Sequence, residues 1–117
     1  MHKILVVDDD AAVRLLFADE LAEEGYRVTT CGDGSKLMGI VREDRPNLIV
    51  MDIKLNGESG LDLLQNIRKA YSNLPVILCS AHPSFMHDPK LIHPDYYVVK
   101  SSNLEELKGK IRMALEG

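Results

Sequence analysis

Residues 3–10, KILVVDDD, decide how the chain folds, because a short apolar run leads directly into three consecutive acids. A compact run of apolar and β-branched residues is typical of a strand that is covered on both faces. Comparable runs occur at residues 27–31, 47–51, 75–79 and 96–99, and four of the five runs are continuous enough for strands covered on both faces. We expect these five segments to be the strands of one sheet.

Between these segments, apolar side chains repeat every three or four residues, which is the spacing of one helix face. The repeating positions are Val13, Leu16, Phe17 and Leu21; Leu37, Ile40 and Val41; Leu64, Ile67 and Tyr71; and Leu104, Leu107, Ile111 and Leu115. Strands that alternate with helices predict a parallel sheet with right-handed crossovers. The predicted fold class is therefore α/β: a three-layer sandwich with a five-stranded parallel sheet, in one domain over residues 1–117.

The connection between the fourth and fifth predicted strands departs from this pattern. It contains Pro83, Pro89 and Pro94. Each proline removes a backbone donor and disfavours helical geometry at the residue before it. We therefore expect the fourth helix to be shortened or irregular.

Composition excludes several classes of protein. With 117 residues, 45% of them hydrophobic and 27% charged, the chain is expected to be one folded domain. Its net charge of −4 argues against direct nucleic-acid binding, and its apolar runs are too short to span a membrane. Cys31 and Cys79 lie far apart in apolar surroundings, which indicates reduced thiols and a cytoplasmic location.

Reactive side chains are expected at the carboxyl ends of the strands, where open parallel sheets bind their ligands. The residues at four of these ends are Asp8, Asp9 and Asp10; Asp52; Ser80; and Lys100. Carboxylates gathered at one edge repel each other unless a cation compensates them, and Mg²⁺ or the Lys100 ammonium could do so. A carboxylate beside both cations is suited to accept a phosphoryl group. Asp10 is expected instead to cap the following helix.

Four motifs, in order along the chain, resemble the receiver domain of two-component response regulators. They are residues 5–9 (LVVDD), residues 49–55 (IVMDIKL) followed by Gly60, residues 80–81 (SA) and residues 97–100 (YVVK). The resemblance implies a flavodoxin-like fold with strand order 2-1-3-4-5. It also implies that a sensor histidine kinase or a phosphotransfer protein phosphorylates Asp52, with output through a downstream effector and with a homodimer as a further outcome of phosphorylation.

The resemblance further implies a metal site. Asp9 and Asp52 would bind Mg²⁺ together with the backbone carbonyl of Lys54, and Asp8 would hold a metal-bound water. These assignments come from the positions that match the family motifs.

The remaining site residues would act on the phosphoryl group. Ser80 would donate a hydrogen bond to a phosphoryl oxygen, Lys100 would form a salt bridge to it, and Tyr97 would change rotamer as Ser80 moves. Such a domain is not an enzyme in the usual sense, because it only assists its own phosphorylation and dephosphorylation.

Three alternatives compete with this interpretation. A pseudo-receiver would keep the fold but act as a protein-binding module without phosphorylation. A small-molecule binder or hydrolase would need a glycine-rich phosphate loop after the first strand, where this chain has acids. A haloacid-dehalogenase-type phosphatase would need a second aspartate two residues after Asp52, where Lys54 stands.

Overall fold

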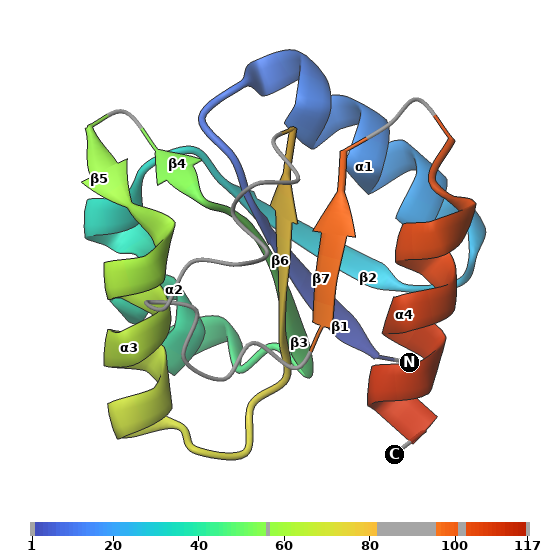
Figure 1. Cartoon of the computed structure of the whole chain (residues 1–117). Helices are drawn as coiled ribbons and strands as arrows, with labels where there is room; N and C mark the ends of the chain where they lie inside the picture. The colour runs from blue at the N-terminus through green and yellow to red at the C-terminus, as the bar shows by residue number, and fades with distance from the viewer. Residues whose placement is uncertain (1, 56, 82–95, 101–102, 117) are drawn as a thin grey trace.

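The computed structural model describes residues 2–55, 57–81, 96–100 and 103–116. Its centre is a five-stranded parallel sheet in the order β2-β1-β3-β6-β7 (Figure 1). The strands are β1 (Lys3–Val7), β2 (Arg27–Cys31), β3 (Leu48–Asp52), β6 (Val76–Ser80) and β7 (Tyr96–Val99). Numbered among themselves, these strands follow the 2-1-3-4-5 order that the family resemblance implied, so the prediction is confirmed.

Helices cover both faces of the sheet (Figure 1). The helical elements are α1 (Ala11–Glu23), the 3-10 helix η1 (Gly34–Lys36), α2 (Leu37–Asp44), α3 (Gly60–Ala70) and α4 (Glu105–Glu116). One core cluster joins the sheet to α1 and α4, and the other joins it to α2 and α3. The three-layer sandwich is therefore confirmed.

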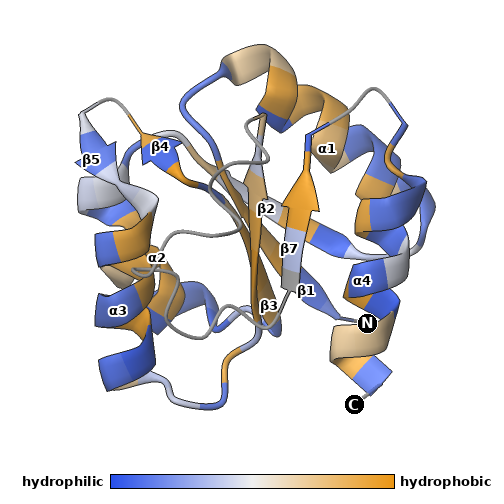
Figure 2. Cartoon of the chain, viewed as in Figure 1, coloured by the Kyte–Doolittle hydropathy of each residue, from blue (hydrophilic) through white to orange (hydrophobic). Residues whose placement is uncertain are grey.

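Strands β1, β3 and β6 are buried on both faces, as their continuous apolar runs predict, whereas most of edge strand β2 is partly or fully exposed. In β1, Ile4 and Val6 belong to the cluster under α1 and α4, whereas Leu5 and Val7 belong to the cluster under α2 and α3. The central strands are accordingly apolar along their length, while the helices alternate between apolar and polar residues (Figure 2). This alternation gives each helix only one face to bury.

Two strands are displaced by one residue from the predicted ranges. The predicted ranges were 47–51 and 75–79, but β3 spans Leu48–Asp52 and β6 spans Val76–Ser80. Asn47 lies just before its strand, where its side-chain oxygen accepts a hydrogen bond from the Lys3 amide at 2.7 Å. Proline has no N–H to contribute to a strand ladder. The shift places two predicted site residues as the last residues of their strands.

Leu16 does not lie on the buried face of α1, so its predicted place on one helix face with Val13, Phe17 and Leu21 is wrong. Val13, Phe17 and Leu21 are four residues apart and lie on one stripe of α1, whose side chains reach the core. Leu16 lies about 100° around the helix from Phe17, and 44% of it is exposed. Its neighbour Leu15 is 64% exposed.

A second, small sheet was not predicted. It pairs β4 (Lys54–Leu55) with β5 (Glu58–Ser59) in antiparallel fashion, directly after β3. The expected irregular fourth helix falls in residues 82–95, outside the described residues, and stays a prediction. Among the helices of the described ranges, none has the length and apolar character that crossing a membrane requires.

Two glycines inside helices offer a stability test. A Cβ on Gly39 of α2 would meet no atom within 4 Å, and one on Gly109 of α4 would come no closer than 3.9 Å to the Arg112 guanidinium. Glycine inside a helix costs about 0.5–1 kcal/mol relative to alanine. Gly39→Ala and Gly109→Ala should each raise the free energy of unfolding by about that amount in urea titrations. A loss of stability in either variant would contradict the open space around these glycines.

Candidate functional site

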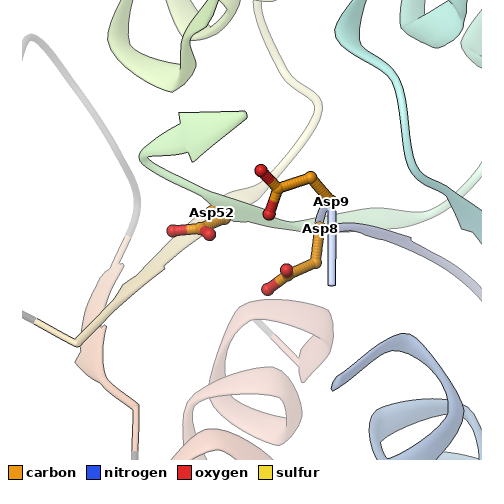
Figure 3. A group of neighbouring side chains, drawn as sticks. All are labelled: Asp8, Asp9 and Asp52. Atoms are coloured by element: carbon orange, nitrogen blue, oxygen red, sulfur yellow. The ribbon is translucent and has the colours of Figure 1, made fainter. Parts of the chain in front are cut away.

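Three carboxylates meet where the two central strands end. Asp8 and Asp9 follow β1, and Asp52 is the last residue of β3, which pairs with β1. One carboxylate oxygen from each residue lies within 4.8 Å of the other two (Figure 3). The acidic cluster that the strand ends predicted is therefore present.

Lys100 places its ammonium against two of these acids. Its Nζ lies 2.7 Å from Asp8 Oδ2 and 3.1 Å from Asp52 Oδ2. The backbone is anchored as well, because the Lys100 N–H donates to the Ser80 carbonyl at 2.7 Å. Only 3% of the Asp8 side chain and 12% of the Asp52 side chain are exposed, so these ion pairs are largely shielded from water.

The pKa values reflect this arrangement. Burial alone lowers the pKa of Lys100, but its hydrogen bonds to Asp8 and Asp52 outweigh burial and raise the pKa above the ordinary value. Burial raises the pKa of Asp52, and the hydrogen bond from Lys100 opposes that rise. Lys100 is thus held as a cation, and Asp52 is a partly desolvated carboxylate beside it.

Ser80 and Tyr97 form the hydroxyl part of the site. Ser80 ends β6 and is buried. Tyr97 lies on the neighbouring strand β7, half-buried, and packs against the core beneath α2 and α3. Burial raises the pKa of the Tyr97 hydroxyl, while a hydrogen bond with Ser80 opposes the rise. The two predicted residues therefore lie together.

The three consecutive acids have different structural roles. The side chain of Asp10 caps α1, accepting hydrogen bonds from the amides of Ala12 at 2.9 Å and Val13 at 3.4 Å. The Asp10 N–H in turn donates to Asp8 Oδ1 at 2.9 Å. The predicted capping role of Asp10 is confirmed, which leaves Asp8 and Asp9 for the site.

The loop after β3 packs closely against α3. The Lys54 N–H donates to Asp52 Oδ1 at 3.4 Å, and the Gly60 N–H donates to the Ile53 carbonyl. A Cβ on Gly60 would overlap the Asp52 carbonyl oxygen and would lie 2.8 Å from Ile53 Cα. Only glycine allows this approach. The Lys54 carbonyl as a metal ligand stays a prediction.

Cys79 lies next to the site but cannot serve as its nucleophile. It is buried in β6, and burial raises the pKa of its thiol to about 12. The positive charge of Lys100 offsets only part of that rise. The thiol therefore stays protonated at neutral pH, which makes it a poor nucleophile.

Sequence reasoning missed Arg14. Its Nη1 donates to the backbone carbonyl of Asp8 at 2.7 Å. Arg14 stands four residues after the cap residue Asp10, and helical side chains point back toward the N-terminus. That spacing is the signal that could have revealed it.

Comparison with known proteins places this geometry in a family. The sequence-family model of the response regulator receiver domain matches residues 4–112 of the chain. The chain is a response regulator receiver domain. It is similar to the probable transcriptional regulatory protein TcrX of Mycobacterium tuberculosis, with 34% identity over 96% of this chain and 49% of that protein. It is also similar to sporulation initiation phosphotransferase F of Bacillus subtilis, with 26% identity over 97% of this chain and 94% of that protein.

Solved receiver structures agree with the fold. Response regulator protein TrrA from Thermotoga maritima, in complex with Mg²⁺-BeF, has a TM-score of 0.94 at 37% identity, covering 98% of this receiver domain and 100% of that chain. TrrA in complex with the histidine kinase ThkA has a TM-score of 0.92 at 37% identity, covering 98% and 99%. The receiver domain spans about half the length of the transcriptional regulators it matches.

Proposed function

We propose that this receiver domain, residues 1–117, accepts a phosphoryl group on Asp52 in a Mg²⁺-dependent reaction. The observation that carries the proposal is the cluster of Asp8, Asp9 and Asp52, with the Lys100 ammonium bonded to two of the three. Membership in the family supports the reaction class. The resulting domain is a phosphoacceptor that assists its own transfer reaction.

The residues present fit Mg²⁺. The cluster consists of carboxylate oxygens, which are the donors that Mg²⁺ prefers, and three carboxylates exceed the charge of one ammonium. Asp9 and Asp52 would hold the ion with the Lys54 carbonyl, and Asp8 would act through a water. When bound, Mg²⁺ supplies positive charge to the phosphoryl oxygens. The Mg²⁺-BeF complex of TrrA supports the same choice of metal.

The chain's own residues carry the transfer. A carboxylate oxygen of Asp52 forms the new bond to phosphorus, while the bond from phosphorus to the donor's leaving group breaks. Lys100, 3.1 Å from Asp52 Oδ2, is placed to pair with a phosphoryl oxygen as charge moves onto it. The Ser80 hydroxyl donates a hydrogen bond to a phosphoryl oxygen, and Tyr97 changes rotamer as Ser80 moves.

The proposed donor is a sensor histidine kinase or a phosphotransfer protein. The complex of TrrA with ThkA supports this class of partner. A donor must reach Asp52 at the carboxyl edge of the sheet, and α1 begins at that edge. Leu15 and Leu16, exposed on α1, are candidate contacts for the donor.

The proposed output is a downstream effector domain or protein. Transcriptional regulators that match this chain are about twice its length, which supports an effector in the same polypeptide. A phosphorylation-dependent homodimer stays a prediction. Cys31 and Cys79 are both free thiols, which supports the expected cytoplasmic location.

Removing the metal tests the proposal. Acetyl phosphate with Mg²⁺ should add one phosphoryl group to the protein, as measured by intact mass, and EDTA should prevent the addition, because the developing charge then lacks its cation. Full modification in EDTA would contradict the metal requirement. A protein that stays unmodified in Mg²⁺ would be a pseudo-receiver.

The crowding of carboxylates predicts an unusual stability effect. The Asp9 carboxylate lies within 4.8 Å of those of Asp8 and Asp52, so its charge adds repulsion when no metal is bound. Asp9→Asn should raise the free energy of unfolding of the metal-free protein by about 1 kcal/mol and should abolish Mg²⁺ binding. Thermal unfolding in EDTA measures the first effect, and Asp19→Asn, which removes an exposed acid from α1, is the control. A lower melting temperature for Asp9→Asn would contradict the repulsion argument.

A further inference from the structure

Arg14 is attached to the backbone of the acidic loop rather than to an acidic side chain. It is half-buried on α1, and its Nη1 donates to the Asp8 carbonyl oxygen at 2.7 Å. The Asp8 N–H donates to the Cys31 carbonyl at 3.0 Å. The backbone of Asp8 is therefore fixed on both of its polar groups.

These contacts determine how Asp9 is presented. Two peptide groups flank Asp9, and a side chain holds each of them. Arg14 holds the carbonyl of the peptide before Asp9, and the Asp8 carboxylate accepts from the N–H of the peptide after it at 2.9 Å. With both planes held, the Asp9 carboxylate is directed to within 4.8 Å of the Asp52 carboxylate (Figure 3).

Gly32 makes room for the Arg14 guanidinium. A Cβ on Gly32 would lie 2.6 Å from Arg14 Nη1 and 3.0 Å from its Cζ. The φ angle of Gly32 is not in the left-handed region, so the residue is needed here for space and not for its backbone conformation. The atoms in the way belong to the end of a flexible side chain, so a methyl group would displace the guanidinium at little cost to the backbone.

From this arrangement we infer that Arg14, seated against Gly32, is a positioning residue for Mg²⁺ binding. It orients the peptide between Asp8 and Asp9 so that the Asp9 carboxylate faces Asp52. The inference rests on the proposed Mg²⁺ site.

The direction of the change in Mg²⁺ affinity when Arg14 is removed distinguishes a positioning role from a purely electrostatic one. A nearby cation repels Mg²⁺, so an arginine that acted only through its charge would weaken binding, and its removal would tighten it. Removal of a positioning arginine should instead weaken Mg²⁺ binding. Loss of groups that orient metal ligands commonly costs about 10- to 100-fold in affinity, and we expect about 10-fold because Arg14 acts through the backbone.

Mg²⁺ titrations followed by amide chemical shifts test the inference on the purified protein. Arg14→Ala and Gly32→Ala should each raise the Kd for Mg²⁺ about 10-fold. Arg14→Lys keeps the charge but loses the planar fork, and it should also bind more weakly than wild type. The matched controls are Arg42→Ala, which removes an exposed arginine from α2, and Gly39→Ala. Both should leave the Kd unchanged. The melting temperature of metal-free Gly32→Ala should stay near that of wild type.

A double variant tests whether the two residues act together. Gly32→Ala works by displacing the guanidinium, so it should add nothing to the loss in an Arg14→Ala background. Unchanged or tighter Mg²⁺ binding in Arg14→Ala and Gly32→Ala, with normal binding by wild type, would overturn this inference alone. Wild-type protein that does not bind Mg²⁺ would overturn the proposed metal site and this inference with it.

Discussion

Asp52→Asn should abolish phosphorylation by acetyl phosphate in the presence of Mg²⁺. The amide that replaces the carboxylate has no anionic oxygen to attack phosphorus, so no acyl phosphate can form. Intact mass should show the modified species for wild type and only unmodified protein for the variant. Asp62→Asn, which removes an exposed acid from α3, should be modified as fully as wild type.

The variant should remain folded, because asparagine keeps the size of the side chain at the end of β3. Circular dichroism before the assay would confirm this. If Asp52→Asn were phosphorylated to the same extent as wild type, the acceptor would have to be another side chain. Peptide mapping would then distinguish Asp8, Asp9 and Ser80.

Gly60→Ala should lower the free energy of unfolding by about 3 kcal/mol or more. The added Cβ would overlap the Asp52 carbonyl oxygen and press on the Ile53 backbone, and backbone atoms cannot move aside as a side chain can. Overpacking a tight interior typically costs about 1–3 kcal/mol and sometimes more. A small domain has only about 5–15 kcal/mol of stability in total.

Urea unfolding measures this loss, and Gly39→Ala is its matched control because a Cβ there meets no atom within 4 Å. The same substitution should weaken Mg²⁺ binding, since the loop that it displaces carries Asp52. A loss below about 1 kcal/mol would show that α3 and the loop move apart easily.

Much of the fold could be predicted from the sequence, because a strand buried on both faces must be apolar throughout. Residues 3–7 and 27–31 were predicted with the bounds that the structure has. The starts of β3 and β6 were each predicted one residue early, since Asn47 and Pro75 are next to apolar runs without entering the strands. The pair β4 and β5 was missed because two-residue strands carry no periodicity.

The candidate site could be predicted to the extent that it depends on strand ends. Parallel strands bring their carboxyl ends to one edge, so Asp8, Asp52 and Lys100 were expected at the same edge of the sheet. The pairing of Arg14 with Gly32, and the contact of Gly60 with Asp52, depend on how helices pack on loops. Local sequence patterns do not report such packing, and only the arrangement in space reveals it.

The shared ammonium of Lys100 has a consequence for the resting domain. One side chain, directly after edge strand β7, ties together the ends of β1 and β3, so part of the acidic charge at this edge is balanced from within the chain. The proposed Mg²⁺ would then neutralise the acidic charge that this ammonium leaves, at a site whose carboxylates are already gathered. Under that proposal, magnesium and a phosphodonor would meet an acidic edge that the resting domain already keeps in place.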